Sequence, residues 1–132
     1  MNYAIGDVIA ERTIHLTRES LVRYAGASGD FNPIHYRDDV AASVGLPGVL
    51  AHGMLTMGIA SSVVISSLDA DTKIIDYGVR FTRPVVVDAE NGADVTVLAK
   101  VGAVDEISAR IDLTVKCDEV TVLVKAQLRV AL

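Results

Sequence analysis

The second half of the chain alternates apolar and polar residues with a period of two, which is typical of antiparallel strands with one buried face. The alternation is clearest from Ile107 to Val115, where every second residue is apolar. Asn91-Gly92 and Asp118-Glu119 interrupt it and are expected to form turns. We therefore expect an antiparallel sheet whose strands include 79–85, 95–101, 107–115 and 120–130.

The first half of the chain carries helix signals instead. We expect a strand over 5–16, followed by a short helix for which Thr17 is the N-cap. The composition of 28–33 indicates a loop, after which Pro33 suits the first position of another short helix. A further short helix is expected over 37–44.

Between these two halves lies the longest apolar stretch, from Met54 to Leu68. It is shorter than the roughly 20 apolar residues that span a membrane, and it contains several serines. Its Met, Leu and Ala content favours a helix over a strand. We expect one long helix over 52–68 that is buried on most of its sides.

The order of these elements predicts an α+β fold in which the sheet wraps around the single apolar helix. A sheet of this kind has two open edges, and pairing an edge with a second subunit is one way to protect it. We therefore expect a dimer.

Composition narrows the class of protein. The hydrophobic fraction is 51%, but aromatic residues make up only 5% and tryptophan is absent, so the core must be aliphatic. The 132 residues suffice for one domain, expected over 1–132, with a core that needs no disulfide. The net charge of −5 and the few aromatic rings argue against a nucleic-acid surface, which needs a basic stripe or stacking rings.

The cysteine and histidine counts bear on cofactors and location. Cys117 is the only cysteine, which excludes a disulfide within the chain and a cysteine-based zinc site. The three histidines, His15, His35 and His52, lack metal-ligand spacing, so neither a metal nor another cofactor is expected. The first residues lack a basic start followed by a long apolar run, so we expect a cytoplasmic protein without a membrane partner.

The densest polar cluster lies between Tyr24 and His35. It places Asp30 and His35 at positions i and i+5 across an Asn-Pro turn, which can bring them to one site although a regular helix would not. Aspartate and histidine are suited to acid–base catalysis near neutral pH, and Asn32 can orient a neighbour. The alternative is structural: Asp30 and Asn32 cap a short helix, and His35 is an ordinary half-buried histidine.

A second candidate opens the long helix, where Gly53 follows His52. A glycine at a helix start leaves its backbone N–H open, and that N–H together with the helix dipole suits a developing oxyanion. The alternative is that Gly53 only permits close packing.

Two motifs carry a family resemblance. The string S-G-D-F-N-P-I-H over 28–35, followed by A-H-G-M-L-T-M-G over 51–58, resembles the MaoC-like (R)-specific enoyl hydratases. Their motifs are close to [ST]-x-D-x-N-P-[IL]-H and H-G-M. The second string also matches the (3R)-hydroxyacyl-ACP dehydratase subunits of mycobacteria. The likeness continues through V-R-F-T-R-P-V over 79–85 and covers nearly the whole chain.

The resemblance implies a hot-dog fold that works as a dimer, with either a second copy or a different hot-dog chain. It implies reversible syn addition of water to trans-2-enoyl thioesters of CoA or acyl carrier protein. Asp30 and His35 would be the catalytic pair, the N–H of Gly53 would polarise the thioester carbonyl, and Asn32 would support the site. Many relatives have a serine where this chain has Gly58, which leaves the accepted chain length open. Gly58 and its small neighbours would widen a tunnel for longer chains.

Two other functions remain open on the same scaffold. A thioesterase also needs an acidic residue and a helix-start N–H, but has no use for the imidazole of His35. A non-catalytic acyl-binding partner would not need Asp30 and His35 together, so their joint presence favours catalysis. Elsewhere, Arg80 and Arg83 are expected to be solvated or to meet the carrier's phosphates, His15 to lie on a strand surface, and Cys117 to be structural.

Overall fold

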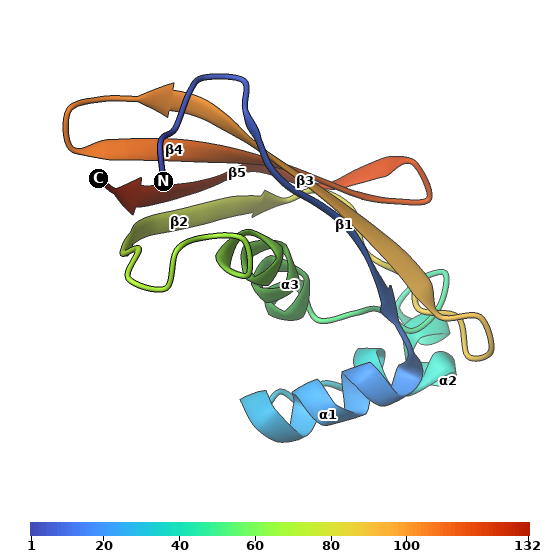
Figure 1. Cartoon of the computed structure of the whole chain (residues 1–132). Helices are drawn as coiled ribbons and strands as arrows, with labels where there is room; N and C mark the ends of the chain where they lie inside the picture. Colours follow the sequence, from blue (N-terminus) through green and yellow to red (C-terminus); the bar gives the residue numbers. More distant parts are fainter.

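The computed structural model describes residues 1–132 and shows one antiparallel sheet that curves over a central helix, α3 (Figure 1). The strand order is β1-β3-β4-β5-β2, so β1 and β2 are the two edges. The expected α+β hot-dog architecture is confirmed. The strands are β1 (Val8–Leu16), β2 (Ile74–Phe81), β3 (Ala93–Val104), β4 (Ser108–Cys117) and β5 (Val120–Ala131), and the helices are α1 (Arg18–Ser28), the 3-10 turn η1 (Pro33–His35), α2 (Asp38–Ser43) and α3 (Gly53–Ile65).

The helix α1 begins and ends where its capping residues dictate. The side chain of Thr17 accepts a hydrogen bond from the backbone N–H of Ser20, and the Ser20 hydroxyl accepts one from the N–H of Thr17, which completes a capping box. Gly29 ends the helix in the left-handed conformation, with φ of 77°. The N-cap prediction at Thr17 is confirmed, and the helix runs past Gly26 before it ends.

The central helix is shorter and less buried within one chain than the sequence predicted. It spans Gly53–Ile65 rather than 52–68, and its buried residues lie on one side: Thr56, Ala60, Val63 and Val64. The sheet covers that side only (Figure 1). Met54 and Ile65, on the uncovered side, are 60% and 49% exposed. The prediction of burial on most sides is therefore wrong for the single chain.

The strand expected over 79–85 is also different. β2 ends at Phe81, and the next segment leaves the sheet edge to pair with the residues that precede α3. The N–H of Ala51 donates to the carbonyl of Val85, and the N–H of Val87 donates to the carbonyl of Val49. Pro84 has no N–H for a ladder, which explains why the strand does not continue. This pairing fixes the segment that leads into α3.

The core lies between the concave face of the sheet and α3. In β3, the expected apolar row is fully buried at Val95, Val97 and Ala99. In β5 the row shifts, because the pairing with β4 is irregular at two points: one next to Lys125, which has φ of 48°, and one at Val122 and Leu123, which are both buried. Simple alternation through 120–130 is therefore wrong at this point.

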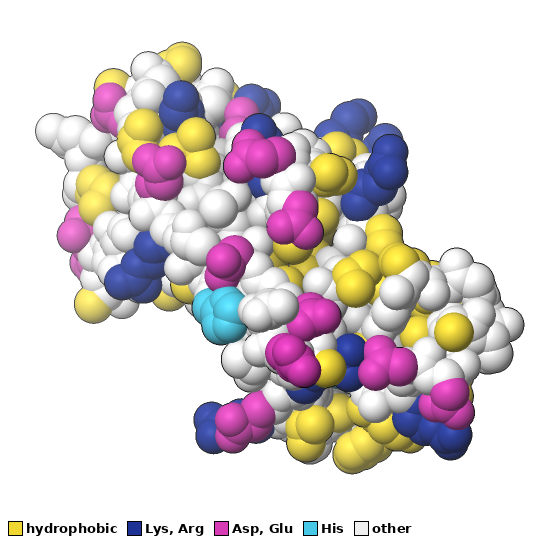
Figure 2. Space-filling model, turned by 90° about the vertical axis from the view of Figure 1, so that its right-hand side faces the viewer, with side chains coloured by type: hydrophobic (Ala, Val, Ile, Leu, Met, Phe, Trp, Pro, Cys, Tyr) yellow, Lys and Arg dark blue, Asp and Glu magenta, His cyan; other side chains and the backbone are white.

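Acidic side chains are spread across the middle of the face shown in Figure 2, while Lys and Arg form separate groups nearer its margins. This face therefore carries no continuous basic stripe. None of the helices combines the length and the apolar character that crossing a membrane requires.

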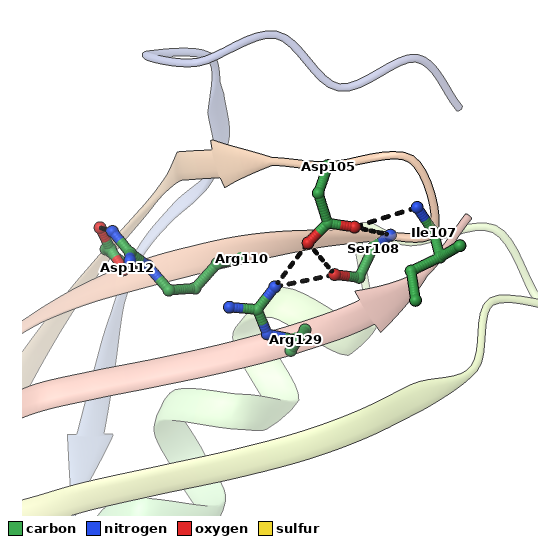
Figure 3. Close-up of polar contacts among 6 residues, drawn as sticks. All are labelled: Asp105, Ile107, Ser108, Arg110, Asp112 and Arg129. Atoms are coloured by element: carbon green, nitrogen blue, oxygen red, sulfur yellow. Dashed lines mark hydrogen bonds and ion pairs between the residues drawn. The ribbon is translucent and has the colours of Figure 1, made fainter.

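The β3–β4 hairpin corrects one more prediction. Ile107 was expected in the apolar row, but it is 74% exposed. The N–H groups of Ile107 and Ser108 both donate to Oδ1 of Asp105, at 2.9 and 2.7 Å, so this segment is a turn (Figure 3). The hydroxyl of buried Ser108 also donates to Asp105 and accepts from Arg129. β4 therefore begins only at Ser108.

Candidate active site

Asp30 lies in the loop that follows α1, and local hydrogen bonds fix its carboxylate. Its N–H donates to the Ser28 hydroxyl at 3.1 Å, and its Oδ1 accepts from the N–H of Asn32 at 3.1 Å. The second oxygen, Oδ2, points toward His35. The contact with Asn32 uses one carboxylate oxygen and leaves the other to face His35, so this structural contact is compatible with the chemical role considered for Asp30.

His35 ends the turn η1, and its tautomer follows from its partner. Nδ1 lies 2.7 Å from the carbonyl oxygen of Leu50, which can only accept, so Nδ1 carries the hydrogen. Nε2 is then unprotonated in the neutral ring and lies 3.8 Å from Oδ2 of Asp30. The side chain of His35 is 10% exposed, whereas that of Asp30 is 51% exposed. The sequence prediction that Asp30 and His35 meet is borne out by this geometry.

Asn32 stands beside this pair as a cap. Its Oδ1 accepts a hydrogen bond from the N–H of Ile34 at 3.2 Å, which starts η1. The side chain does not line the pocket described below. In the single chain its visible role is to hold the loop between Asp30 and His35.

Gly53 is the first residue of α3, and its N–H has no acceptor in the protein. A helix leaves its first N–H groups unpaired, and no side chain caps this one. The ring of Phe81 lies so close that a Cβ at position 53 would sit 3.0 Å from it. Close packing and an open N–H, the two alternatives for Gly53, are thus both present.

A pocket of about 330 Å³ joins these elements. His35 and Gly53 both line it, together with Thr56, Phe81 and Arg83. Arg83 forms no ion pair with any carboxylate, so its charge is available at the pocket rim. Arg80, the other arginine considered from sequence, is absent from the lining.

Gly58 lies away from this pocket on the exposed side of α3. A Cβ there would meet no atom within 4 Å, so a serine would fit at this position. The nearby Ser61 and Ser62 hydroxyls donate to carbonyls of their own helix, at 2.9 and 2.8 Å. None of these residues lines the pocket of the single chain.

His52 is the residue whose place the sequence did not reveal. Only 1% of it is exposed, and its ring stacks on that of His35 with centroids 3.8 Å apart. Its Nε2 lies 3.1 Å from the backbone carbonyl oxygen of Asp30. In the sequence, only its position next to Gly53 in the second motif indicated that His52 lies at the site.

Asp30, His35 and His52 hold potential metal-ligand atoms within 4.8 Å of one another. The two imidazole planes are inclined by only 21°, however, and stacked rings direct their lone pairs along nearly parallel planes. One ion cannot then lie in both ring planes. His52 Nε2 and His35 Nδ1 are also already committed to carbonyl oxygens. The donor set therefore does not suit a shared metal ion.

Two residues outside the site behave as the sequence predicted. His15 lies on the exposed face of β1, where it pairs with Asp94 of β3 at 2.7 Å. Cys117 is buried and has no disulfide partner, and burial raises the pKa of its thiol. A thiol with a raised pKa stays protonated at neutral pH and is a poor nucleophile.

The arrangement offers three chemical functions: His35 and Gly53 line the pocket, and Asp30, which does not line it, lies next to His35. An unprotonated imidazole nitrogen can accept a proton, a carboxylate can hold a polar reactant, and an open helix-start N–H can stabilise negative charge on oxygen. Such a set suits proton transfer next to a carbonyl group.

Comparisons with known proteins agree with this picture. The MaoC-like domain matches residues 3–121. The (R)-specific enoyl-CoA hydratase of Rhodospirillum rubrum is 30% identical over 85% of this chain and 74% of that protein. The 3-hydroxyacyl-thioester dehydratase X of Mycobacterium tuberculosis is 36% identical over 60% of this chain, a match that spans only 27% of the relative's length. A solved MaoC-like dehydratase superimposes with a TM-score of 0.90 and 32% identity, over 98% of this chain and 40% of the other. The chain belongs to the MaoC-like domain family.

Proposed function

We propose that this chain, as one domain over 1–132, is a hydro-lyase that interconverts (3R)-hydroxyacyl and trans-2-enoyl thioesters in fatty-acid metabolism. The observation that carries the proposal is the placement of Asp30 Oδ2 3.8 Å from Nε2 of His35, which lines a pocket together with Gly53. The hydratase and dehydratase relatives support the same reaction.

In the hydration direction, one water molecule lies between the two catalytic groups. The 3.8 Å gap is too long for a direct hydrogen bond but suits a water that donates one hydrogen bond to His35 Nε2 and one to Asp30 Oδ2. As the water oxygen bonds to C3, the pair takes one proton from the water. The same proton is then delivered to C2, so one O–H bond and the C2–C3 π bond break, while one C–O and one C–H bond form.

Negative charge gathers on the thioester oxygen while C3 is attacked and C2 is not yet protonated. The N–H of Gly53, at the positive end of α3, donates to this oxygen. Positioned acid–base groups contribute about 10²–10⁴-fold to a rate, and one oxyanion donor about 10²–10³-fold. No redox or metal cofactor is needed for this step.

The test is to mix the purified chain with crotonyl-CoA and to record both the enoyl absorbance and the release of free thiol. We expect the absorbance to fall without thiol release, because water adds across the double bond while the thioester stays intact. Thiol release would instead identify a thioesterase, and neither change would favour the non-catalytic acyl-binding partner.

The proposed assembly pairs β2 of the chain with a second hot-dog subunit, either another copy or a different chain. β2 is an open edge, and its Ile74, Ile75 and Phe81 are 40–54% exposed. The uncovered side of α3, with Met54 and Ile65, would gain cover from the same partner. Sedimentation analysis tests this pairing, and a chain that stays monomeric at assay concentrations while fully active would contradict it.

The carrier is CoA or acyl carrier protein, both of which bear phosphates. Because the net charge of the chain is −5, attraction must come from local cations, and Arg83 is the unpaired one at the pocket. Replacing Arg83 by Gln should raise KM for crotonyl-CoA more than it lowers kcat. The proposal includes the cytoplasmic location that the sequence led us to expect.

A further inference from the structure

His52 touches both members of the proposed catalytic pair. Its ring lies against the face of His35, with centroids 3.8 Å apart and planes inclined by 21°. The ring of Tyr24, from α1, meets it edge-on at 4.7 Å. Held between these two rings and 1% exposed, the imidazole has little freedom to move.

The hydrogen bond from His52 to Asp30 assigns its tautomer. The acceptor is the backbone carbonyl oxygen of Asp30, 3.1 Å away, so Nε2 carries the hydrogen. Nδ1 is then a bare acceptor, and this buried nitrogen has no hydrogen-bond partner. An unsatisfied buried polar atom costs about 1–3 kcal/mol. A phenyl ring would fill the same space without that cost, so what distinguishes histidine here is its Nε2–H.

We propose that His52 is a positioning residue, which sets the catalytic carboxylate of Asp30 against His35 through its Nε2–H and its ring face. The inference rests on the proposed function, since it concerns the geometry of that reaction. Asp30 lies in an exposed loop whose other ties, to Ser28 and Asn32, are local. The bond from His52, 22 residues away, is the tie that fixes this loop relative to α3 and His35. An error of about 1 Å in such a pair can cost about 10²-fold in rate.

The role requires a neutral His52. Burial lowers its pKa, and the nearby charge of His35 acts in the same direction, while the contacts with Asp30 oppose them. Tyr24, His35 and Asp30 are the titratable groups that face the ring. A proton on Nδ1 would find no acceptor, and it would place a cation against His35 just when His35 takes a proton from water.

Three substitutions of His52 distinguish the contribution of its N–H donor from that of its ring. Gln places an amide N–H near the position of Nε2, Asn places the same group near Nδ1, and Phe keeps the ring without any donor. We expect His52→Phe and His52→Asn to lower kcat for crotonyl-CoA about 10- to 100-fold with KM changed less than about threefold. His52→Gln should recover at least tenfold relative to His52→Asn. His15→Gln, on the surface, is the control and should match the wild type.

The comparison of Gln with Asn keeps the test meaningful even if the variants lose stability. The melting temperature of each variant is recorded, and all rates are measured well below the lowest melting temperature. A His52→Gln chain no more active than His52→Asn, or a fully active His52→Phe chain, would overturn the positioning role. A wild type that hydrates no enoyl thioester would overturn the proposed function first, and the role of His52 with it.

Discussion

The molecule contains two histidine–aspartate pairs, and the closer pair is the one outside the pocket. His15 and Asp94 lie 2.7 Å apart on the open face of the sheet, where more than half of each side chain is exposed. His35 and Asp30 lie 3.8 Å apart, but the imidazole is nine-tenths buried, stacks on His52 and shares a pocket with Gly53. A short contact alone therefore does not mark a catalytic site.

The difference between the pairs lies in their surroundings. Water and salt screen the exposed pair, and such pairs contribute only about 0–1 kcal/mol to stability. His15 and Asp94 face each other because β1 and β3 place them in register, which is a sheet contact. At the other pair, the longer gap leaves room for a reactant, and a helix-start N–H lies on the same pocket. Burial, spacing and a nearby donor, rather than proximity, indicate chemistry.

The largest expected effect comes from removing one carboxylate from each pair. Asp30→Asn should lower the hydration rate of crotonyl-CoA by about 10²–10⁴-fold, because an amide NH₂ in place of Oδ2 cannot accept the hydrogen bond that holds the water beside His35. Asp94→Asn, the matched control, should keep the wild-type rate. Initial rates followed at the enoyl absorbance measure both. Equal rates for the two variants would remove the distinction between the pairs.

A smaller effect is expected from a change at the open N–H at the start of α3. Only the His35–Asp30 pair has such a donor nearby. In Gly53→Ala the new methyl would lie 3.0 Å from Phe81 and would narrow the pocket beside that N–H. We expect kcat/KM to fall about 10- to 100-fold. Complete removal of such a donor costs about 10²–10³-fold, so the expected loss is no larger than that. Gly58→Ala is the control, since its methyl meets nothing within 4 Å. It should keep its rate and gain up to about 1 kcal/mol of stability.

The smallest effect concerns stability rather than rate. The pKa of His52 is lowered from its ordinary value of 6.5, so below that pH the unfolded chain binds the proton that the folded chain excludes. The free energy of unfolding should therefore fall as pH drops through about 6.5 toward the folded pKa, and it should be insensitive to this group above. Urea unfolding of wild type and His52→Gln over this range measures the difference. If the free energy of unfolding depends on pH in the same way in both chains, burial of His52 does not keep its ring neutral in the folded state.

Much of the fold was predictable because the relevant signals are local. Thr17 caps α1 through a residue three positions away, and the apolar row of β3 is buried as its period of two requires. The pairing of Asp30 with His35 was predictable for the same reason, since one short loop and η1 hold both residues.

What the sequence did not predict depends on distant partners. Pro84 explains why β2 does not continue, but the pairing of the following segment with the residues before α3 depends on a distant partner. The bulge at Lys125 depends on how β5 pairs with its neighbouring strands. The alternation of apolar and polar residues along β5 does not predict it. The place of His52 depends on a carbonyl 22 residues earlier, so its motif position alone could not assign a role. The exposed side of α3 carries Met54 and Ile65 beside Gly58 and Ser62, and only the structure shows that one sheet leaves this side uncovered.

The central claim is that Asp30 and His35 act together from one side of the substrate, and hydration in D₂O tests it most directly. Crotonyl-CoA is converted in D₂O, and NMR of the product gives the configuration at C2 and C3. Because one pair takes the proton from water and returns it to C2, we predict a (3R)-hydroxy product with deuterium and hydroxyl added to the same face. Addition to opposite faces, or a random mixture at C2, would contradict the account.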